Sequence, residues 1–355
     1  MTSRRLFLAG LVSVGLTPTT TWANAGGPSF LAAAKTQAGD YVLCGLSGAG
    51  QIVFQIPLPA RGHAAAAHPY RAEAVAFARR PGRFALILNC ATGNVSAELT
   101  SPKGRHFYGH GAFGADGRYL YTSENDFETA QGVIGVWDSA QDYKRIGEFA
   151  SGGVGPHDIK LLPSGNLVVA NGGIETHPES GRAKLNIATM EPNLTYLTQS
   201  GEQLEQVGMG ADLHKNSIRH LAISGNGLVA FGMQWQGDKG QVVPLIGTHQ
   251  RGQDAEILDL GDGIYDRMNG YVGSIAISAD GSQVAATSPR GSVVVSADLV
   301  RRDVIKVTPQ ADVCGVVFGG GGMVVTTGMG QVIGGWLGGQ ESYPDLHWDN
   351  HLVGL

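Results

Sequence analysis

Four histidines take equivalent places in a pattern that recurs along the chain. They are His110, His157, His220 and His351. The first three each lie seven or eight residues before the last glycine of a polar turn, and the fourth lies in an unpaired copy at the C-terminal end. In the other copies the same place is held by Ala74 (or its neighbour Glu73), Ser274 and Cys314. Imidazoles brought together in this way suit copper, iron or zinc, so the pattern predicts a transition-metal site with the four histidines as ligands.

A structural interpretation of the same histidines stays open. Histidines near inner strands also tie neighbouring blades together by hydrogen bonds, because a neutral imidazole offers one donor and one acceptor. No HxH or HExxH segment is present, so only the fold would assemble the ligands. Cys314 reads most simply as a small apolar strand residue, with thiolate ligation as its alternative.

The elements that must position these side chains recur with a period typical of β-propeller blades. Each unit has a short apolar strand, a glycine turn and a second apolar strand, followed by a polar loop. The copies span His110–Thr122, His157–Ala170, His220–Gly232, Ser274–Thr287, Cys314–Thr327 and, more weakly, Ala74–Asn89 around Pro81 and Gly82. Six copies of this kind indicate a repeat architecture.

The seventh unit is divided between the two ends of the chain. His347–Leu355 reads as a lone inner strand, and Tyr41–Leu46 with Gln51–Ile56 as the strands that complete its sheet. Pairing the last strand with the first ones closes a ring and removes exposed sheet edges. We therefore expect an all-β, seven-bladed β-propeller in residues 26–355, closed by the C-terminal strand; an irregular β-sandwich is the alternative.

Polar loops that follow the second strands should lie at the same mouth of the channel as the histidines. A rigid scaffold holds such loops, and they often carry binding groups. The candidate cofactor-binding residues are Glu124, Asn125, Asn171, Glu175, His177, Arg182, Arg219 and Gln234. Glu124 and Glu175 could serve as acid–base groups or as partners of metal ligands, or be ordinary solvated loop residues. No nucleophile elbow is present, so no catalytic residue is assigned.

The N-terminal segment is typical of an export signal. Arg4 and Arg5 precede a short apolar stretch, and Ala23-Asn24-Ala25 forms an A-x-A cleavage site. Residues 1–25 are thus expected to be a twin-arginine signal peptide, with the folded protein delivered to the periplasm. Of the three cysteines, Cys44, Cys90 and Cys314, at most two can pair, so a scaffold built on disulfides is excluded.

Composition excludes several function classes. Glycine makes up 54 of 355 residues without a collagen period, and beyond the N-terminal segment no apolar run is long enough to span a membrane. The net charge of −5 argues against a nucleic-acid partner, because phosphate binding requires a basic surface.

Several segments resemble a bacterial family of exported propellers that is described only as a domain of unknown function. They are Ser123–Asp126, Gly132–Asp138, Gly155–His157, Val169–Pro178, Lys184–Asn186, Asn216–His220 and Met233–Gly237. Members of that family are often encoded beside imelysin-type iron-regulated proteins and dihaem peroxidase-like proteins. The resemblance implies periplasmic iron or metal handling, with an iron-uptake or dihaem protein as partner, and it brings no catalytic residues. More distantly, the repeats are similar to those of YVTN-type and WD40-like propellers.

Three functions remain open at this stage. The leading one is a periplasmic propeller that binds a transition metal, or a partner that carries one, at the histidine-lined mouth. The second is a protein-interaction scaffold without metal. The third is a hydrolase or oxidoreductase that uses the same mouth as its active site.

Overall fold

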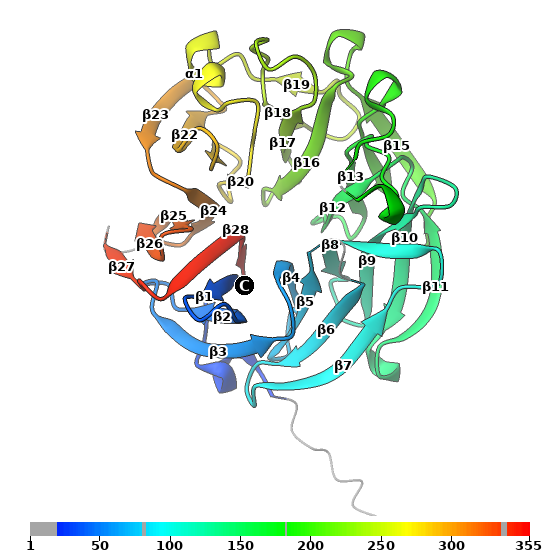
Figure 1. Ribbon diagram of the computed structural model, residues 1–355, viewed down its shortest axis with the longest axis vertical. Coiled ribbons are helices and arrows are strands. Elements are labelled where there is room, and N and C mark those ends of the chain that lie inside the picture. Colours follow the sequence, from blue (N-terminus) through cyan, green and yellow to red (C-terminus); the bar gives the residue numbers. More distant parts are fainter. Residues whose placement is uncertain (1–19, 80–82, 182, 335–338) are drawn as a thin grey trace, which may run out of the picture.

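Seven four-stranded antiparallel sheets form a ring in the described part of the chain, as the computed structural model shows (Figure 1). The structure describes residues 20–79, 83–181, 183–334 and 339–355. The expected seven-bladed propeller is therefore confirmed. The first strand of the chain, β1, is the second strand of its sheet, because β28 from the C-terminal end is the innermost strand of that sheet.

The seven inner strands surround the central axis. They are β4 (Gly62–Ala67), β8 (Arg105–Phe113), β12 (Pro156–Leu161), β16 (Asn216–Ile223), β20 (Ser274–Ile277), β24 (Val313–Gly319) and β28 (Leu346–Gly354). The second strands are β1 (Phe30–Thr36), β5 (Glu73–Ala78), β9 (Tyr119–Asp126), β13 (Leu167–Asn171), β17 (Val229–Trp235), β21 (Gln283–Ser288) and β25 (Gly322–Thr327). Alanine, valine and leucine make up most of the buried positions of the second strands, which suits adjacent sheets that pack face to face, whereas the inner strands also bury histidines and other polar residues.

The third and fourth strands form the outer half of each blade. The third strands are β2 (Tyr41–Leu46), β6 (Phe84–Asn89), β10 (Gln131–Asp138), β14 (Asn193–Leu197), β18 (Ile246–His249), β22 (Val293–Asp298) and β26 (Gln331–Gly334). The outermost strands are β3 (Ile52–Leu58), β7 (Asn94–Thr100), β11 (Lys144–Ala150), β15 (Gln203–Gly208), β19 (Glu256–Ile257), β23 (Asp303–Pro309) and β27 (Gln340–Ser342).

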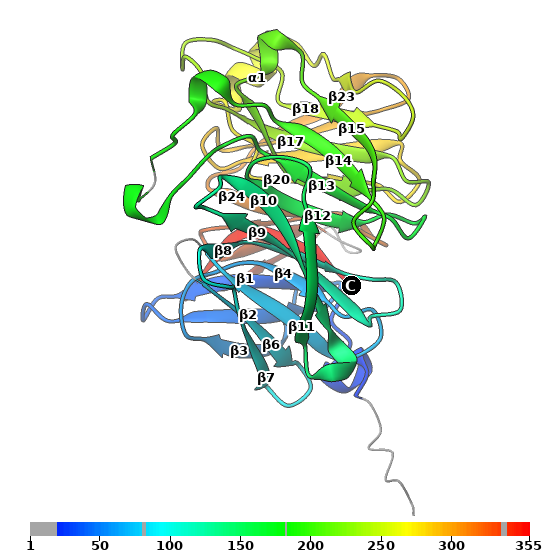
Figure 2. The same cartoon turned by 90° about the vertical axis from the view of Figure 1, so that its right-hand side faces the viewer.

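Helices are short and lie in the connections. They are η1 (Trp22–Ala25), η2 (Ser139–Gln141), η3 (Pro178–Ser180), η4 (Ile187–Thr189), η5 (Ala211–Leu213) and α1 (Asp262–Arg267). The long connection after β13, which carries η3 and η4, projects from one face of the disc (Figure 2). None of the helices in the described ranges has the length and apolar character of a membrane span.

Ring closure follows the expectation, with one correction. β28 pairs antiparallel with β1, and β1 pairs with β2, so the last strand completes the first sheet. The sequence interpretation placed Tyr41–Leu46 next to the C-terminal strand and missed Phe30–Thr36 in between. That strand reads Phe-Leu-Ala-Ala-Ala-Lys-Thr and is buried on both faces over its first five residues, so it lacks the alternation that marks a strand in sequence.

One blade was also assigned wrongly from the sequence. The segment from Ala74 is the second strand, β5, and the inner strand of that blade is β4, which begins twelve residues earlier at Gly62. The turn at Pro81 and Gly82, on which the assignment depended, lies outside the described residues. The error arose because both hairpins of this blade consist of short, alanine-rich strands.

Residues 20–25 lie against the propeller as η1. The indole Nε1 of Trp22 donates to the backbone carbonyl of His68 (2.8 Å), and Ala25 is buried. The alanines of the expected cleavage site belong to this helix, whereas Arg4 and Arg5 lie outside the described residues.

Candidate metal centre in the central channel

Irregular pairing of the inner strands aims their histidines at the axis. The register between β8 and β9 shifts between Phe107 and Gly111, on either side of His110. Comparable shifts occur in β12 around His157 and in β4 around His63. Because a bulge frees a residue from the ladder and turns its side chain, these shifts explain how successive blades present an imidazole to the same space.

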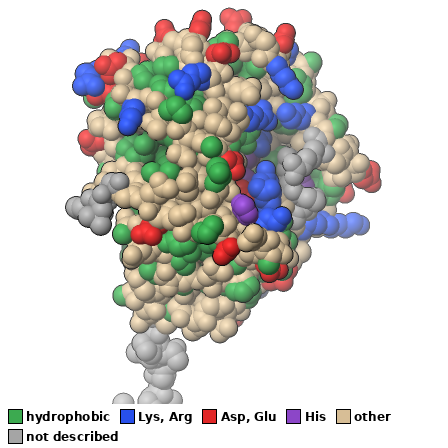
Figure 3. Space-filling view, turned by 60° about the vertical axis from the view of Figure 1, so that its left-hand side comes forward, with side chains coloured by type: hydrophobic (Ala, Val, Ile, Leu, Met, Phe, Trp, Pro, Cys, Tyr) green, Lys and Arg blue, Asp and Glu red, His purple; other side chains and the backbone are tan. Residues whose placement is uncertain are grey.

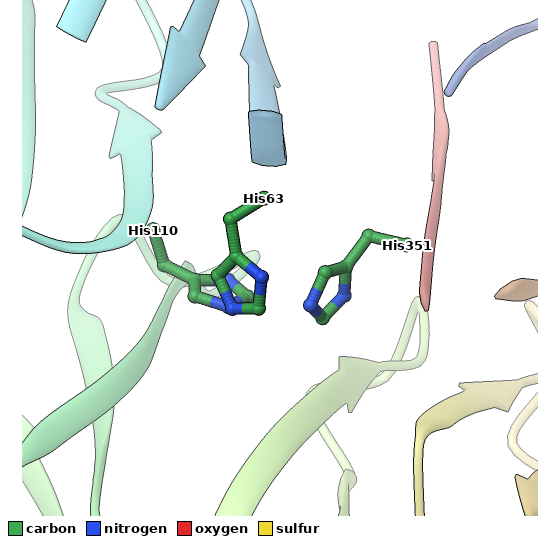
Figure 4. Close-up of side chains that lie close together, drawn as sticks. All are labelled: His63, His110 and His351. Atoms are coloured by element: carbon green, nitrogen blue, oxygen red, sulfur yellow. The ribbon is translucent and has the colours of Figure 1, made fainter. Parts of the chain in front are cut away.

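Five imidazoles meet in the channel, and we call them the histidine cluster: His63, His110, His157, His220 and His351. Going round the ring, the centres of neighbouring imidazoles are 4.9, 4.8, 5.0, 5.1 and 4.6 Å apart, which brings the five into mutual contact. Figure 4 shows three of them, from β4, β8 and β28, with their rings turned toward one another. Segments almost 290 residues apart in the chain thus supply adjacent side chains.

Ring nitrogens in the cluster form two overlapping triads. One contains His63, His110 and His351; the other contains His110, His157 and His220. Within each triad one nitrogen of every ring lies within 4.8 Å of the others, close enough to converge on a metal ion after small side-chain rotations. His110 belongs to both triads and is the centre of the arrangement.

Two rings of the cluster are held in a defined tautomer. Nδ1 of His110 lies 3.1 Å from Oδ1 of Asp158, and Nδ1 of His157 donates to the carbonyl of Arg219 (2.6 Å). With the proton on Nδ1, the lone pair is on Nε2 of each ring. Zinc- and copper-binding histidines are commonly oriented in this way, by a carboxylate or a backbone carbonyl on the second nitrogen.

Four other nitrogens of the cluster are buried without a hydrogen-bond partner among the described residues. They are Nδ1 of His63, Nε2 of His110, Nδ1 of His220 and Nε2 of His351. A buried polar atom left unpaired costs about 1–3 kcal/mol, and most proteins contain few of them. Four such atoms in one place are unusual, and histidines grouped in this way could hold a metal ion.

Burial keeps four of the imidazoles neutral. The pKa of His63, His157 and His351 lies well below its ordinary value, first because of burial and then because of repulsion from neighbouring charged groups. The same causes lower the pKa of His220 to about 3. Neutral imidazoles at pH 7 have the lone pairs that metal ligands need.

Asp158 is the carboxylate closest to the cluster. It is buried, and its oxygens accept hydrogen bonds from the backbone N–H groups of Ile159 and Leu221. Although burial alone would raise it, the pKa of Asp158 is held well below its usual range by Lys160, His110 and the Leu221 N–H. The group is therefore an anion that orients His110 rather than a proton carrier.

The structure brings together all four histidines named from the sequence and adds His63. The sequence interpretation missed His63 because Ala74 had been placed on the inner strand. The pair Gly62-His63, which begins the alanine-rich strand β4 and matches the pair Gly109-His110 within β8, was the available signal.

The equivalent positions on the two remaining inner strands do not carry metal ligands. Oγ of Ser274 accepts from the backbone N–H of Val316, and Sγ of Cys314 donates to the carbonyl of Asp312. All three cysteines are free and buried, and burial raises the pKa of the Cys314 thiol to about 12.

Three of the eight candidate cofactor-binding residues belong to the interior of a blade. Glu124 is fully buried and forms an ion pair with Arg145 (2.6 Å). Asn125 donates to the carbonyl of Thr176, and Asn171 bonds Ser151, Asn193 and Thr195. Their polar groups are satisfied within the fold, because strand ends near the axis leave backbone and hydroxyl groups that need partners.

The connection after β13 carries three more of these candidates. The backbone N–H of Glu175 donates to Asn186, and Nδ1 of His177 accepts from the backbone N–H of Glu179 at the start of η3. His177 thus caps a short helix and is not one of the clustered imidazoles. Arg182 lies outside the described residues.

Arg219 and Gln234, by contrast, adjoin the cluster. The carbonyl of Arg219 holds His157, and Nε2 of Gln234 lies 3.5 Å from Nε2 of His220 while donating to Val272 (3.0 Å). Both side chains line a small pocket of about 60 Å³ together with Tyr108 and Thr176.

A larger pocket of about 300 Å³ lies beside the other half of the cluster. It includes Arg61 and Gly62, just before His63, and Asp349 and Asn350, just before His351. Arg61 forms an ion pair with the buried carboxylate of Asp349 (2.7 Å). Figure 3 shows a face of the molecule on which Lys and Arg side chains surround a hollow.

Comparison with known proteins supports the fold. No curated protein matches the sequence. Among solved structures, hydrazine synthase of Kuenenia stuttgartiensis is similar, with a TM-score of 0.60 and 14% identity over 86% of this chain and 90% of that chain. At this identity the likeness shows a shared propeller architecture alone.

The model of a protein family matches residues 56–355, a span that contains all five histidines of the cluster. That family is described as "Protein of unknown function (DUF1513)". The match covers most of the chain and every inner strand. The chain therefore belongs to this family of propellers of unknown function.

Proposed function

We propose that this protein binds one transition-metal ion in the central channel through the histidine cluster. The observation that carries the proposal is the set of four buried imidazole nitrogens without partners, on His63, His110, His220 and His351. A metal ion would satisfy several of them at once, and it offsets a cost that the metal-free fold would otherwise bear.

An all-imidazole donor set favours copper and zinc over iron. No cluster histidine shares its triad with a carboxylate or a thiolate, whereas non-haem iron(II) sites commonly combine histidines with a carboxylate. At equal availability, Cu²⁺ binds nitrogen ligands more tightly than Fe²⁺ does. Copper is thus the first candidate, with zinc next and iron third.

Metal handling in the periplasm is the context that we propose for this site. The paired arginines and the A-x-A segment support export, and the resemblance to exported propellers encoded beside iron-regulated proteins supports the link to metals. N-terminal sequencing of the protein from periplasmic fractions tests export. A start near Gly26, lost on substituting both Arg4 and Arg5 by lysine, is expected; an uncleaved cytoplasmic chain would contradict it.

Metal analysis of the protein purified through its native export route tests the main proposal. We expect about one copper or zinc ion per chain, retained after dialysis against a weak chelator. The double variant His63→Gln, His110→Gln should lose the ion. The matched control His177→Gln, His214→Gln changes two histidines outside the cluster and should keep it.

Folding must be checked in the same samples. Circular dichroism and chemical denaturation of the metal-free variants show whether the propeller is intact. Metal-free wild-type protein that takes up neither copper, zinc nor iron on titration would refute the proposal, whatever the variants do.

A further inference from the structure

The charge around the cluster does not balance a divalent metal ion. Imidazoles supply no negative charge, and Asp158 is the carboxylate that contacts one of them. That carboxylate already faces the ammonium group of Lys160 (3.4 Å). A metal ion with two positive charges would remain largely uncompensated in a buried place, and uncompensated buried charge is costly.

A cationic pocket shares a wall with the cluster. Arg219 lies between Ile218 and His220 on β16, and its backbone carbonyl accepts a hydrogen bond from Nδ1 of His157. Gln234 lies on the neighbouring strand β17. Its side-chain Nε2 donates a hydrogen bond to the carbonyl of Val272 and lies 3.5 Å from Nε2 of His220. The pocket therefore adjoins the triad of His110, His157 and His220 through Arg219 and Gln234, which contact His157 and His220.

The pocket offers donors and positive charge. Its polar lining is Tyr108, Thr176, Lys184, Arg219, Gln234 and Gln236, with no carboxylate among the described residues that line it. The ammonium group of Lys184 bonds the side-chain oxygen of Gln236, and the hydroxyls of Tyr108 and Thr176 lie 3.3 Å apart. Guanidinium, ammonium, hydroxyl and amide groups together form the usual recognition set for carboxylates and inorganic oxyanions.

The size of the pocket limits the ligand. A volume of about 60 Å³ holds a few water-sized groups, which suits a carboxylate, a carbonate or a phosphate and excludes a large chelator. Lys184 and Thr176 belong to the connection after β13, which therefore contributes two of the residues that line the pocket.

We propose that this pocket binds a small oxyanion, of the carboxylate or carbonate class, as a co-ligand of the metal in the histidine cluster. This inference rests on the proposed function. One oxygen of the anion occupies an open coordination position, and the others accept hydrogen bonds from Arg219 and Lys184. The anion supplies the negative charge that the neutral imidazoles lack.

The test uses the full-length mature protein loaded with Co²⁺ or Cu²⁺, whose absorption spectra report changes of ligand. Acetate, bicarbonate and phosphate are titrated separately, so that the three arms distinguish an organic carboxylate from inorganic oxyanions. At least one is expected to shift the spectrum with saturation. Arg219→Gln and Lys184→Gln should weaken that anion about ten-fold or more, because a charge-assisted hydrogen bond is lost.

Two controls separate this inference from a folding defect. Arg290→Gln removes an exposed arginine that packs on Tyr271, and it should leave the anion affinity unchanged. Arg219→Lys keeps the positive charge and should restore part of the affinity. The two pocket variants Arg219→Gln and Lys184→Gln should bind metal at the wild-type stoichiometry, because neither side chain is a proposed metal ligand.

The outcomes are distinct. Wild-type protein that binds the metal but shows no spectral response to any of the three anions overturns this inference and leaves the metal site standing. An anion response that persists at full affinity in both Arg219→Gln and Lys184→Gln also overturns it. Failure to bind any metal defeats the proposed function, and the co-ligand with it.

Discussion

Nδ1 of His110 and Oδ1 of Asp158 lie 3.1 Å apart, although the two residues belong to neighbouring blades. His110 is on β8 and Asp158 on β12, and both side chains are almost completely buried. The contact joins two blades at the axis and leaves Nε2 of the one histidine shared by both triads with its lone pair toward the channel. The same interaction thus joins two blades and orients a histidine that we propose as a metal ligand.

Replacing Asp158 by asparagine should weaken metal binding while the propeller stays folded. Asparagine keeps an acceptor for the backbone but loses the negative charge that orients His110, and such partners contribute about 10- to 100-fold to metal affinity. Competition with a chromophoric chelator measures the change. Asp280→Asn, at an exposed turn, is the matched control. An affinity equal to that of the wild type would show that Asp158 only joins the blades.

The metal-free protein should tolerate loss of a cluster histidine unusually well. His351→Leu removes a buried nitrogen without a partner, so the free energy of unfolding should stay within about 1 kcal/mol of the wild type or rise. Metal affinity should fall at the same time. Urea denaturation of the metal-free proteins and metal titration measure the two effects.

His249→Leu provides the contrast. His249 is buried too, but its Nδ1 accepts from Tyr196 (2.6 Å) and its Nε2 donates to Gln253 (2.8 Å). Its loss should destabilise the fold by about 1–3 kcal/mol and leave metal binding intact. If His351→Leu and His249→Leu destabilise the fold equally, the unpaired nitrogen of His351 has no energetic cost, and the argument that unpaired nitrogens mark a metal site fails.

Stability of the metal-free protein should fall as the pH is lowered from about 6.5 toward 3. Burial and neighbouring charges lower the pKa of His220 to about 3 in the folded state, whereas the unfolded chain has an ordinary histidine pKa near 6.5. The unfolded state therefore binds more protons in this window, so stability is full above it and is lost as the pH decreases. Urea denaturation at pH 7.5, 6, 5 and 4 measures the slope.

The variant His220→Leu should show a shallower slope over the same pH range. Bound metal should be released in that window too, because protons compete for the imidazole lone pairs. Identical pH profiles for the wild type and His220→Leu would contradict the assignment of the effect to this histidine.

Trp348→Ala should destabilise the ring by about 3–5 kcal/mol, since the indole is buried where β28 closes the first sheet. It should also weaken metal binding, because the same strand carries His351. Chemical denaturation measures the loss. Tyr70→Ala, at an exposed aromatic side chain, should change stability by less than about 0.5 kcal/mol. A mild effect of Trp348→Ala would mean that closure depends little on this strand.

The repeat, the number of blades and the closure by the C-terminal strand could be predicted from the sequence. Turns such as Asp116-Gly117 and Asn226-Gly227 follow local rules, because glycine accepts positive φ at no steric cost, and both glycines have that conformation here. Three of the five clustered histidines followed from counting back from such turns, and His351 followed from its place in the unpaired C-terminal copy. His63 did not, because two alanine-rich hairpins in one blade made the choice of inner strand ambiguous.

Residue types and their spacing determined that this chain forms a ring of short strands and that histidines recur at equivalent places in several of the repeated units. Only the tertiary structure decided which ring nitrogens are paired, which stay unpaired, and that Asp158 and Arg219 reach across from other blades to hold His110 and His157. The physical reason is that strand formation depends on local backbone preferences, whereas bulge positions and contacts between blades depend on packing among residues far apart in the chain.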